Sequence, residues 1–74
     1  MKRKTRDIVR VLNEYGGTGN GEGFYASYAT WSIRCNRARR RKGVLEVHSF
    51  AVEGGWVEPS QQHFTDVYGR EITA

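Results

Sequence analysis

The chain has 74 residues, of which 12 are Lys or Arg and 8 are Asp or Glu, and 38% of it is hydrophobic. A chain of this size forms one small domain at most, which excludes a two-domain hinge and a large enclosed active-site cleft. The single cysteine, Cys35, cannot form an internal disulfide, so a disulfide-stapled secreted scaffold is excluded and a reducing, cytoplasmic location is expected.

Charge is divided unequally along the chain. Residues 1–42 contain eleven of the twelve basic groups and three acids, whereas residues 43–74 contain one basic group and five acids. The halves therefore carry +8 and −4, which sum to the net charge of +4. This asymmetry indicates a surface that faces a polyanion, although attraction between the two halves would also account for it.

The first predicted element is a helix that begins at Thr5 as N-cap and ends at Gly16-Gly17. Its apolar residues follow helical spacing, and Asp7 lies in the first turn, where the helix dipole favours an acid. Residues 1–4 are expected to form a basic arm. Residues 16–23 are expected to form a Gly-rich loop, whose spacing matches neither the dinucleotide fingerprint nor the phosphate-binding loop.

A second helix is predicted from Ala26 to Lys42. The apolar residues of this stretch follow a 4, 3, 4, 3 rhythm that places them on one helical stripe. The basic run 39–42 would lie in the last turn, and Gly43 would supply a left-handed cap. The members of the stripe are Phe24, Tyr28, Trp31, Cys35 and Ala38.

Strand patterns dominate after Gly43. Residues 44–52 are rich in apolar and β-branched types, and Gly54-Gly55 predicts a two-residue hairpin turn before Trp56. Asp66 and Gly69 occupy the first and last positions of a type I turn between two short strands.

The expected fold is α+β, with two helices packed on a small antiparallel sheet. The predicted core consists of Ile8, Leu12, Tyr28, Trp31, Leu45, Val47, Phe50 and Trp56.

The sequence contains no recognisable catalytic pattern, so no enzymatic activity and no cofactor are expected. Cys35, His48 and His63 match no zinc-ligand spacing. Cys35 lies on the predicted buried stripe, where a free cysteine behaves as a small hydrophobe.

The positive signal is the basic part of the second predicted helix. Arg34, Arg37 and Arg41 would lie on one helical stripe, and six cations without an acid repel one another unless a polyanion binds them. Arginine can grip a phosphate or a guanine edge, and an asparagine amide suits an adenine edge. The candidate nucleic-acid-binding residues are Arg34, Asn36, Arg37, Arg40, Arg41 and Lys42, with Lys2, Arg3 and Lys4 of the arm.

Two resemblances accompany this pattern. Residues 37–47, Arg-Ala-Arg-Arg-Arg-Lys-Gly-Val-Leu-Glu-Val, resemble the end of a recognition helix and the first wing strand of a winged helix-turn-helix domain. Residues 66–70 resemble a wing turn. The resemblance implies insertion of the basic helix into the DNA major groove. Residues 36–42 also resemble the arginine-rich RNA-binding helices of phage antiterminators, which keeps RNA open as a target.

The expected function is therefore non-enzymatic nucleic-acid binding by a small bacterial or phage transcription regulator, with DNA ahead of RNA as the target. The alternative is a protein-interaction module, such as a phage-type regulator that docks on host RNA polymerase.

Overall fold

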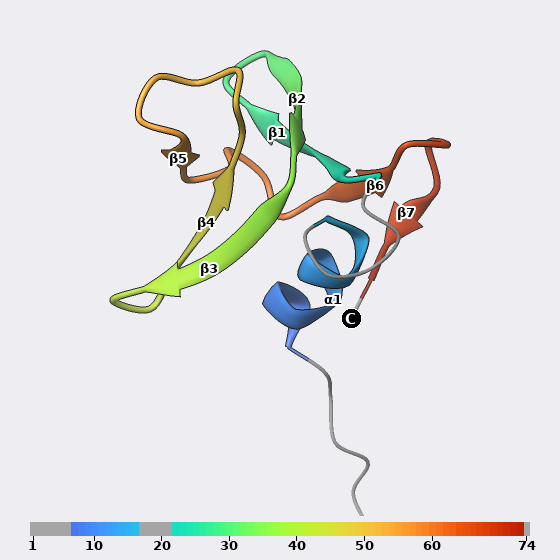
Figure 1. The fold of residues 1–74 in the computed structure, drawn as a ribbon, viewed down its shortest axis with the longest axis horizontal. Coiled ribbons are helices and arrows are strands. Elements are labelled where there is room, and N and C mark those ends of the chain that lie inside the picture. The colour runs from blue at the N-terminus through green and yellow to red at the C-terminus, as the bar shows by residue number, and fades with distance from the viewer. Residues whose placement is uncertain (1–6, 17–21, 74) are drawn as a thin grey trace, which may run out of the picture.

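The computed structural model describes residues 7–16 and 22–73 and arranges them as one helix and two antiparallel sheets (Figure 1). The helix is α1 (Ile8–Tyr15). The four-stranded sheet has the order β2-β1-β6-β7, and the three-stranded sheet has the order β3-β4-β5. The strands are β1 (Phe24–Tyr28), β2 (Trp31–Cys35), β3 (Arg37–Arg41), β4 (Val44–His48), β5 (Trp56–Val57), β6 (Phe64–Asp66) and β7 (Glu71–Ile72).

The helix α1 confirms the first predicted element, with a later start. Its N-cap is Asp7, whose carboxylate accepts a hydrogen bond from the backbone N–H of Val9 at 3.1 Å. The predicted cap Thr5 lies outside the described residues. The helix ends at Gly16, where an added Cβ would lie 2.1 Å from the backbone oxygen of Asn36. Only glycine therefore allows the helix end to approach the junction of β2 and β3 this closely.

The second predicted helix is wrong. Residues 26–42 form the end of β1, all of β2 and β3, and the turns beside them, so the described residues contain one helix instead of two on a sheet. A two-residue loop joins β1 to β2, with Tyr28 paired to Trp31 across it. Lys42 and Gly43 join β3 to β4, and both have positive φ, at 53° and 80°. Positive φ at both central positions is the geometry of a tight hairpin turn and not of a helix cap.

The strands β2 and β3 are parts of one long ribbon that bends at Asn36 and serves both sheets (Figure 1). Cys35 and Ala38 both face the core, although strict alternation would place residues three apart on opposite faces. The bend at Asn36 therefore reverses which residues of the ribbon point inward. This reversal produces the spacing of three that resembles a helical stripe.

The core lies between the two sheets and α1, and α1 packs against β3. Its rings Phe24 and Phe64 meet edge to face, with centroids 6.2 Å apart. Leu12, Leu45 and Val47 of the predicted core are buried, whereas Tyr28, Trp31 and Phe50 are exposed by 37%, 70% and 86%. Ile8 and Trp56 are half-buried. The buried hydrophobic residues are Val11, Leu12, Phe24, Ala26, Cys35, Ala38, Leu45, Val47, Phe64 and Ile72.

The strands after Gly43 are confirmed in part. β4 and β5 form the predicted hairpin, but His48 already pairs with Trp56, so residues 49–55 form a longer loop than the predicted Gly54-Gly55 turn. The turn between β6 and β7 is as predicted, because the N–H of Gly69 donates to the backbone oxygen of Asp66 at 3.0 Å. The Asp66 carboxylate also accepts from the N–H groups of Tyr68 and Arg70. No helix among the described residues is long and apolar enough to cross a membrane.

Candidate functional site

The three-stranded sheet has a buried face and a solvent-facing one. Ala38, Leu45 and Val47 are buried on the inner side, so the residues that alternate with them point outward. On β3 these outward residues are three arginines, and on β4 and β5 they include an acid and two rings. We call this surface the basic face; it consists of Arg37, Arg39, Arg41, Glu46, His48 and Trp56.

One arginine of the basic face is held in place by its neighbours. Arg39 Nε donates to Glu46 Oε1 at 2.8 Å, and the Arg39 guanidinium carbon lies 3.9 Å from the centroid of the Trp56 ring. The carboxylate and the ring fix this guanidinium over β4 and β5. Arg39 thus forms the ordered centre of the face and holds Trp56 beside it.

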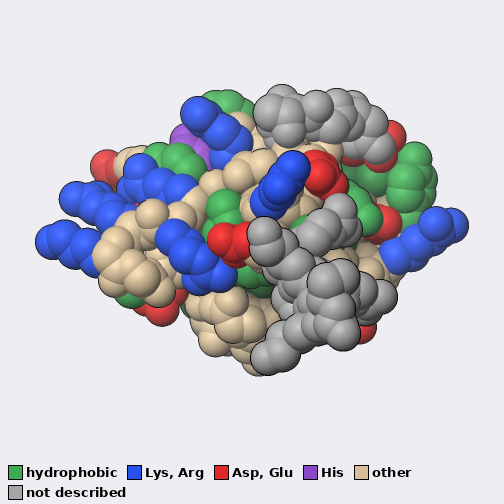
Figure 2. All heavy atoms as spheres, turned by 90° about the horizontal axis from the view of Figure 1, so that it is seen from below, with side chains coloured by type: hydrophobic (Ala, Val, Ile, Leu, Met, Phe, Trp, Pro, Cys, Tyr) green, Lys and Arg blue, Asp and Glu red, His purple; other side chains and the backbone are tan. Residues whose placement is uncertain are grey.

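Arg37 and Arg41 flank this centre on the same strand. In the part of the chain that the structure describes, no carboxylate forms an ion pair with either guanidinium. Lys42 extends the positive charge into the turn. Figure 2 shows Lys and Arg side chains gathered at the left-hand end of the molecule, where the β3–β4 hairpin lies in Figure 1. The two uncompensated arginines are therefore available to an external anion.

The structure divides the residues that the helical pattern had grouped. Arg34 lies on β2, where its Nε donates at 3.1 Å to the backbone oxygen of Glu22 and its Nη2 donates to the same oxygen. Arg40 points to the opposite side of β3 from the basic face and pairs with the Asp7 carboxylate at 3.0 Å. Only Arg37 and Arg41 of the predicted stripe share a face. Lys2, Arg3 and Lys4 lie outside the described residues.

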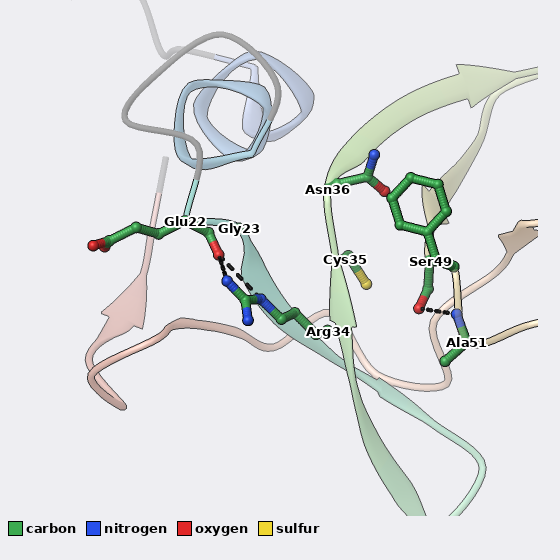
Figure 3. A pocket seen from close by; sticks show the side chains of 8 residues that line it. Glu22, Gly23, Arg34, Cys35, Asn36, Ser49 and Ala51 are labelled. Atoms are coloured by element: carbon green, nitrogen blue, oxygen red, sulfur yellow. Dashed lines mark hydrogen bonds between the residues drawn. The ribbon is translucent and has the colours of Figure 1, made fainter.

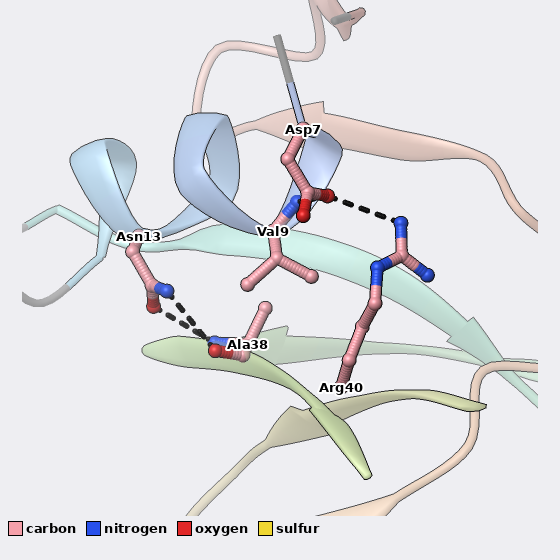
Figure 4. A network of polar contacts seen from close by, with 5 residues as sticks. All are labelled: Asp7, Val9, Asn13, Ala38 and Arg40. Carbon is pink, nitrogen blue, oxygen red and sulfur yellow. Dashed lines mark hydrogen bonds and ion pairs between the residues drawn. The ribbon is translucent and has the colours of Figure 1, made fainter. Parts of the chain in front are cut away.

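The N-terminus of α1 is tied to β3 by that ion pair (Figure 4). The hydrogen bond from the Val9 N–H and the neighbouring guanidinium of Arg40 both lower the pKa of the Asp7 carboxyl. The ionised Asp7 carboxylate therefore stabilises the fold at pH values above the usual carboxyl pKa. This stabilisation is lost as the pH falls through the lowered pKa of Asp7. Because Arg40 already has this partner, it is a structural residue and not a member of the basic face.

A row of rings connects the basic face to the junction of β2 and β3. The His48 ring meets Trp56 on one side and Phe50 on the other, each with a centroid distance of 5.1 Å. His48 Nδ1 lies 2.7 Å from Asn36 Oδ1, and since a carbonyl oxygen can only accept, this nitrogen carries the proton. Asn36 thus lies beside the basic face, to which it is connected by its hydrogen bond with His48.

The sequence pattern did not assign His48, Phe50 and Trp56 to the site. Arg39 was counted among the repelling cations but not among the binding residues, because its place beside Trp56 depends on strand pairing. The alternation of arginine at 37, 39 and 41 was the available signal, since a spacing of two places side chains on one face of a strand.

Cys35 is buried, with 1% of its surface exposed, and residues 7–16 and 22–73 contain no group of three or more His, Cys, Asp or Glu side chains that could hold a metal ion. His48 is bound to Asn36, and His63 Nε2 lies 3.7 Å from the Glu71 carboxylate. Burial raises the pKa of the Cys35 thiol to about 12. A neutral thiol is a poor nucleophile, so the structure assigns this residue to the core.

The raised pKa of Cys35 has a measurable consequence. In the unfolded chain the thiol ionises near its usual pKa of 9.0, whereas in the folded protein it stays neutral up to about pH 12. The free energy of unfolding should therefore be unaffected by this group below pH 9 and should fall as the pH rises from 9 toward 12. The expected loss is at most about 1.4 kcal/mol for each pH unit. Urea unfolding at pH 8 and pH 10.5 measures it, with Cys35→Ala as the reference that removes only this group. An identical pH dependence in the two proteins would contradict the buried thiol.

Comparison of the chain with models of known families, with curated proteins and with solved structures found no match.

Proposed function

We propose that the protein is a non-enzymatic, cytoplasmic nucleic-acid-binding protein of the transcription-regulator type, and that it binds through the basic face. The observation that supports this is the alternation of Arg37, Arg39 and Arg41 on one side of β3, beside the rings of Trp56 and His48. Arginines at regular spacing match the repeated charge of a phosphate backbone, and neighbouring rings offer surfaces for bases or sugars.

The mode of binding differs from the one that the resemblance implied. The residues expected to form a recognition helix lie in β2 and β3, so the described chain has no helix at this place that could enter the major groove. The phosphate backbone would instead run along β3, where successive outward side chains stand about 6.6 Å apart. Arg37 and Arg41 would grip phosphates, and the fixed guanidinium of Arg39 would lie between them.

The test is a double substitution, Arg37→Ala with Arg41→Ala. Affinity for oligonucleotides should fall at every salt concentration, because two phosphate contacts are lost. The slope of log K against log salt should become shallower by up to about two. Fluorescence anisotropy with labelled 12-mers across a salt series measures both quantities.

The matched control is Arg10→Ala with Arg70→Ala, which removes the same charge from α1 and from the turn between β6 and β7. This control should lose much less affinity and keep most of the slope. Equal losses in the two double variants would show that net charge alone attracts the nucleic acid, and the basic face would then have no special role.

A second candidate function, a protein-interaction module, is supported by the tip of the β1–β2 hairpin. Tyr28 and Trp31 lie opposite each other there, with 37% and 70% of their surfaces exposed. Large exposed aromatic residues are common at the centre of protein interfaces. Under this function oligonucleotide binding would be weak, non-specific and lost at moderate salt, and the double substitution on β3 would weaken it no more than the Arg10/Arg70 control.

A further inference from the structure

A pocket of about 430 Å³ lies at the junction of β2 and β3 (Figure 3). Its walls come from the chain before β1, from the bend at Asn36, and from residues 49–51 after β4. Small-molecule pockets in proteins commonly have volumes of about 300–1,000 Å³, so this one can hold a small ligand. The pocket is open on one side, so a ligand attached to a longer molecule can enter it.

The walls combine a ring, an amide and a cation. Phe50 lines the pocket with 86% of its surface exposed, which leaves its ring available for stacking. Asn36 Oδ1 is occupied by His48, whereas its Nδ2 has no hydrogen-bond partner among residues 7–16 and 22–73. Arg34 donates to a backbone carbonyl and not to a carboxylate, so its positive charge is not neutralised.

Glu22, the acidic residue in the pocket wall, directs its carboxylate away from the space where an anionic ligand would bind. Glu22 contributes its main chain to the wall through the carbonyl that Arg34 binds, and its side chain extends away from Asn36 and Ser49 (Figure 3). The Glu22 carboxylate accepts a hydrogen bond from the Tyr68 hydroxyl of the β6–β7 turn at 3.3 Å. The local field in the pocket is therefore set by Arg34.

The pocket is continuous with the basic face. Asn36 immediately precedes Arg37 in the chain, and His48 contacts Asn36, Phe50 and Trp56. A phosphate backbone that runs along β3 would thus pass the mouth of the pocket directly after Arg37. A base attached to that backbone reaches Phe50 only if it is unpaired and unstacked from its neighbours.

We propose that this pocket takes one unpaired nucleobase, so that the preferred ligand of the basic face is single-stranded nucleic acid. This inference rests on the proposed function, since the arginines of β3 must first hold the backbone. The base would stack on Phe50, its polar edge would accept a hydrogen bond from Asn36 Nδ2, and Arg34 would lie near the adjoining phosphate.

The experiment compares four 12-mer probes: oligo(dT), oligo(U), a DNA duplex, and an abasic strand that keeps the phosphates without bases. Phe50→Ala should weaken binding of oligo(dT) and oligo(U) about tenfold or more, because one stacking contact is lost. Binding of the abasic strand should not change. Phe50→Trp should restore the loss, and Trp31→Ala, which removes an exposed ring elsewhere, should have no effect.

The outcomes separate this inference from the function on which it rests. Loss of oligo(dT) and oligo(U) affinity in Phe50→Ala, with abasic-strand affinity unchanged, supports the base pocket, whichever of the two strands binds more tightly. Equal binding of single strand, duplex and abasic strand, with Phe50→Ala indifferent, overturns the pocket while the basic face stands. If no probe binds at low salt, both the pocket and the nucleic-acid function are wrong.

Discussion

Replacement of Phe24 by alanine should remove a large part of the protein's free energy of unfolding. The Phe24 side chain has no exposed surface and meets Phe64 edge to face at the centre of the four-stranded sheet. Truncation of a buried phenylalanine costs about 3–5 kcal/mol. A 74-residue chain has roughly 4–11 kcal/mol of total stability, at 0.05–0.15 kcal/mol per residue. Urea unfolding followed by circular dichroism measures the loss.

The control for Phe24 is Trp31, which belongs to the same apolar rhythm in the sequence. Trp31 is 70% exposed at the tip of the β1–β2 hairpin, so Trp31→Ala should change the free energy of unfolding by less than about 1 kcal/mol. On a helix the two residues would be buried together, and each substitution would cost about 3–5 kcal/mol. A large loss in Trp31→Ala would therefore contradict the strands.

The second large effect is expected at Asn13, which joins α1 to the free edge of β3 (Figure 4). Asn13 Nδ2 donates to the backbone oxygen of Ala38 at 3.0 Å, and the Ala38 N–H donates to Asn13 Oδ1 at 2.9 Å. The amide therefore pairs with this residue as a neighbouring strand would. Asn13→Ala leaves two backbone groups of a buried residue without partners, at about 1–3 kcal/mol for each group.

Asn13→Asp provides the matched comparison, because it keeps the shape and one acceptor but cannot donate to the Ala38 carbonyl. Its loss of stability should lie near that of the alanine variant, since a carboxylate also repels the carbonyl oxygen. Amide hydrogen exchange at Ala38 should accelerate in Asn13→Ala, which loses the acceptor of its N–H, and much less in Asn13→Asp, which keeps an acceptor. Stability equal to that of the parent protein in either variant would show that water replaces the amide without cost.

The first helix and the β6–β7 turn could be predicted because local chemistry determines them. The spacing of Ile8, Val11, Leu12 and Tyr15 is helical, and the turn depends on Asp66 and on a glycine three residues later. Neither element requires knowledge of a distant partner. The predicted burial of Cys35 is also confirmed, although the element that buries it is a strand.

The stretch 26–42 could not be predicted in the same way. Phe24, Cys35 and Ala38 are buried, but a hairpin turn separates the first from the second and the bend at Asn36 separates the second from the third. The turn and the bend each shift the strand alternation, and the resulting spacing of the apolar residues matches a helical period by coincidence. Tyr28 and Trp31 fit the period only because they face each other across the turn and not because they are buried.

The grouping of the arginines also depends on whether residues 26–42 form a helix or strands. A helical period places Arg34, Arg37 and Arg41 on one face. A strand period instead places Arg37, Arg39 and Arg41 on one face. Arg40 then lies on the opposite face, where it pairs with Asp7. The aromatic part of the face could not be found in sequence, because Trp56 reaches Arg39 only through the pairing of β4 with both β3 and β5.

The bond between Asn13 and Ala38 also bears on whether the edge of the three-stranded sheet can pair with a strand of a second copy. An open sheet edge invites a strand of another molecule, which is the usual first step of aggregation. On β3 the side-chain amide occupies that position, and the arginines of the same strand repel an identical strand. The opposite edge, β5, is only two residues long. The three-stranded sheet can thus leave a broad face uncovered for a ligand, while the amide on β3 and the shortness of β5 both oppose the addition of a further strand at its edges.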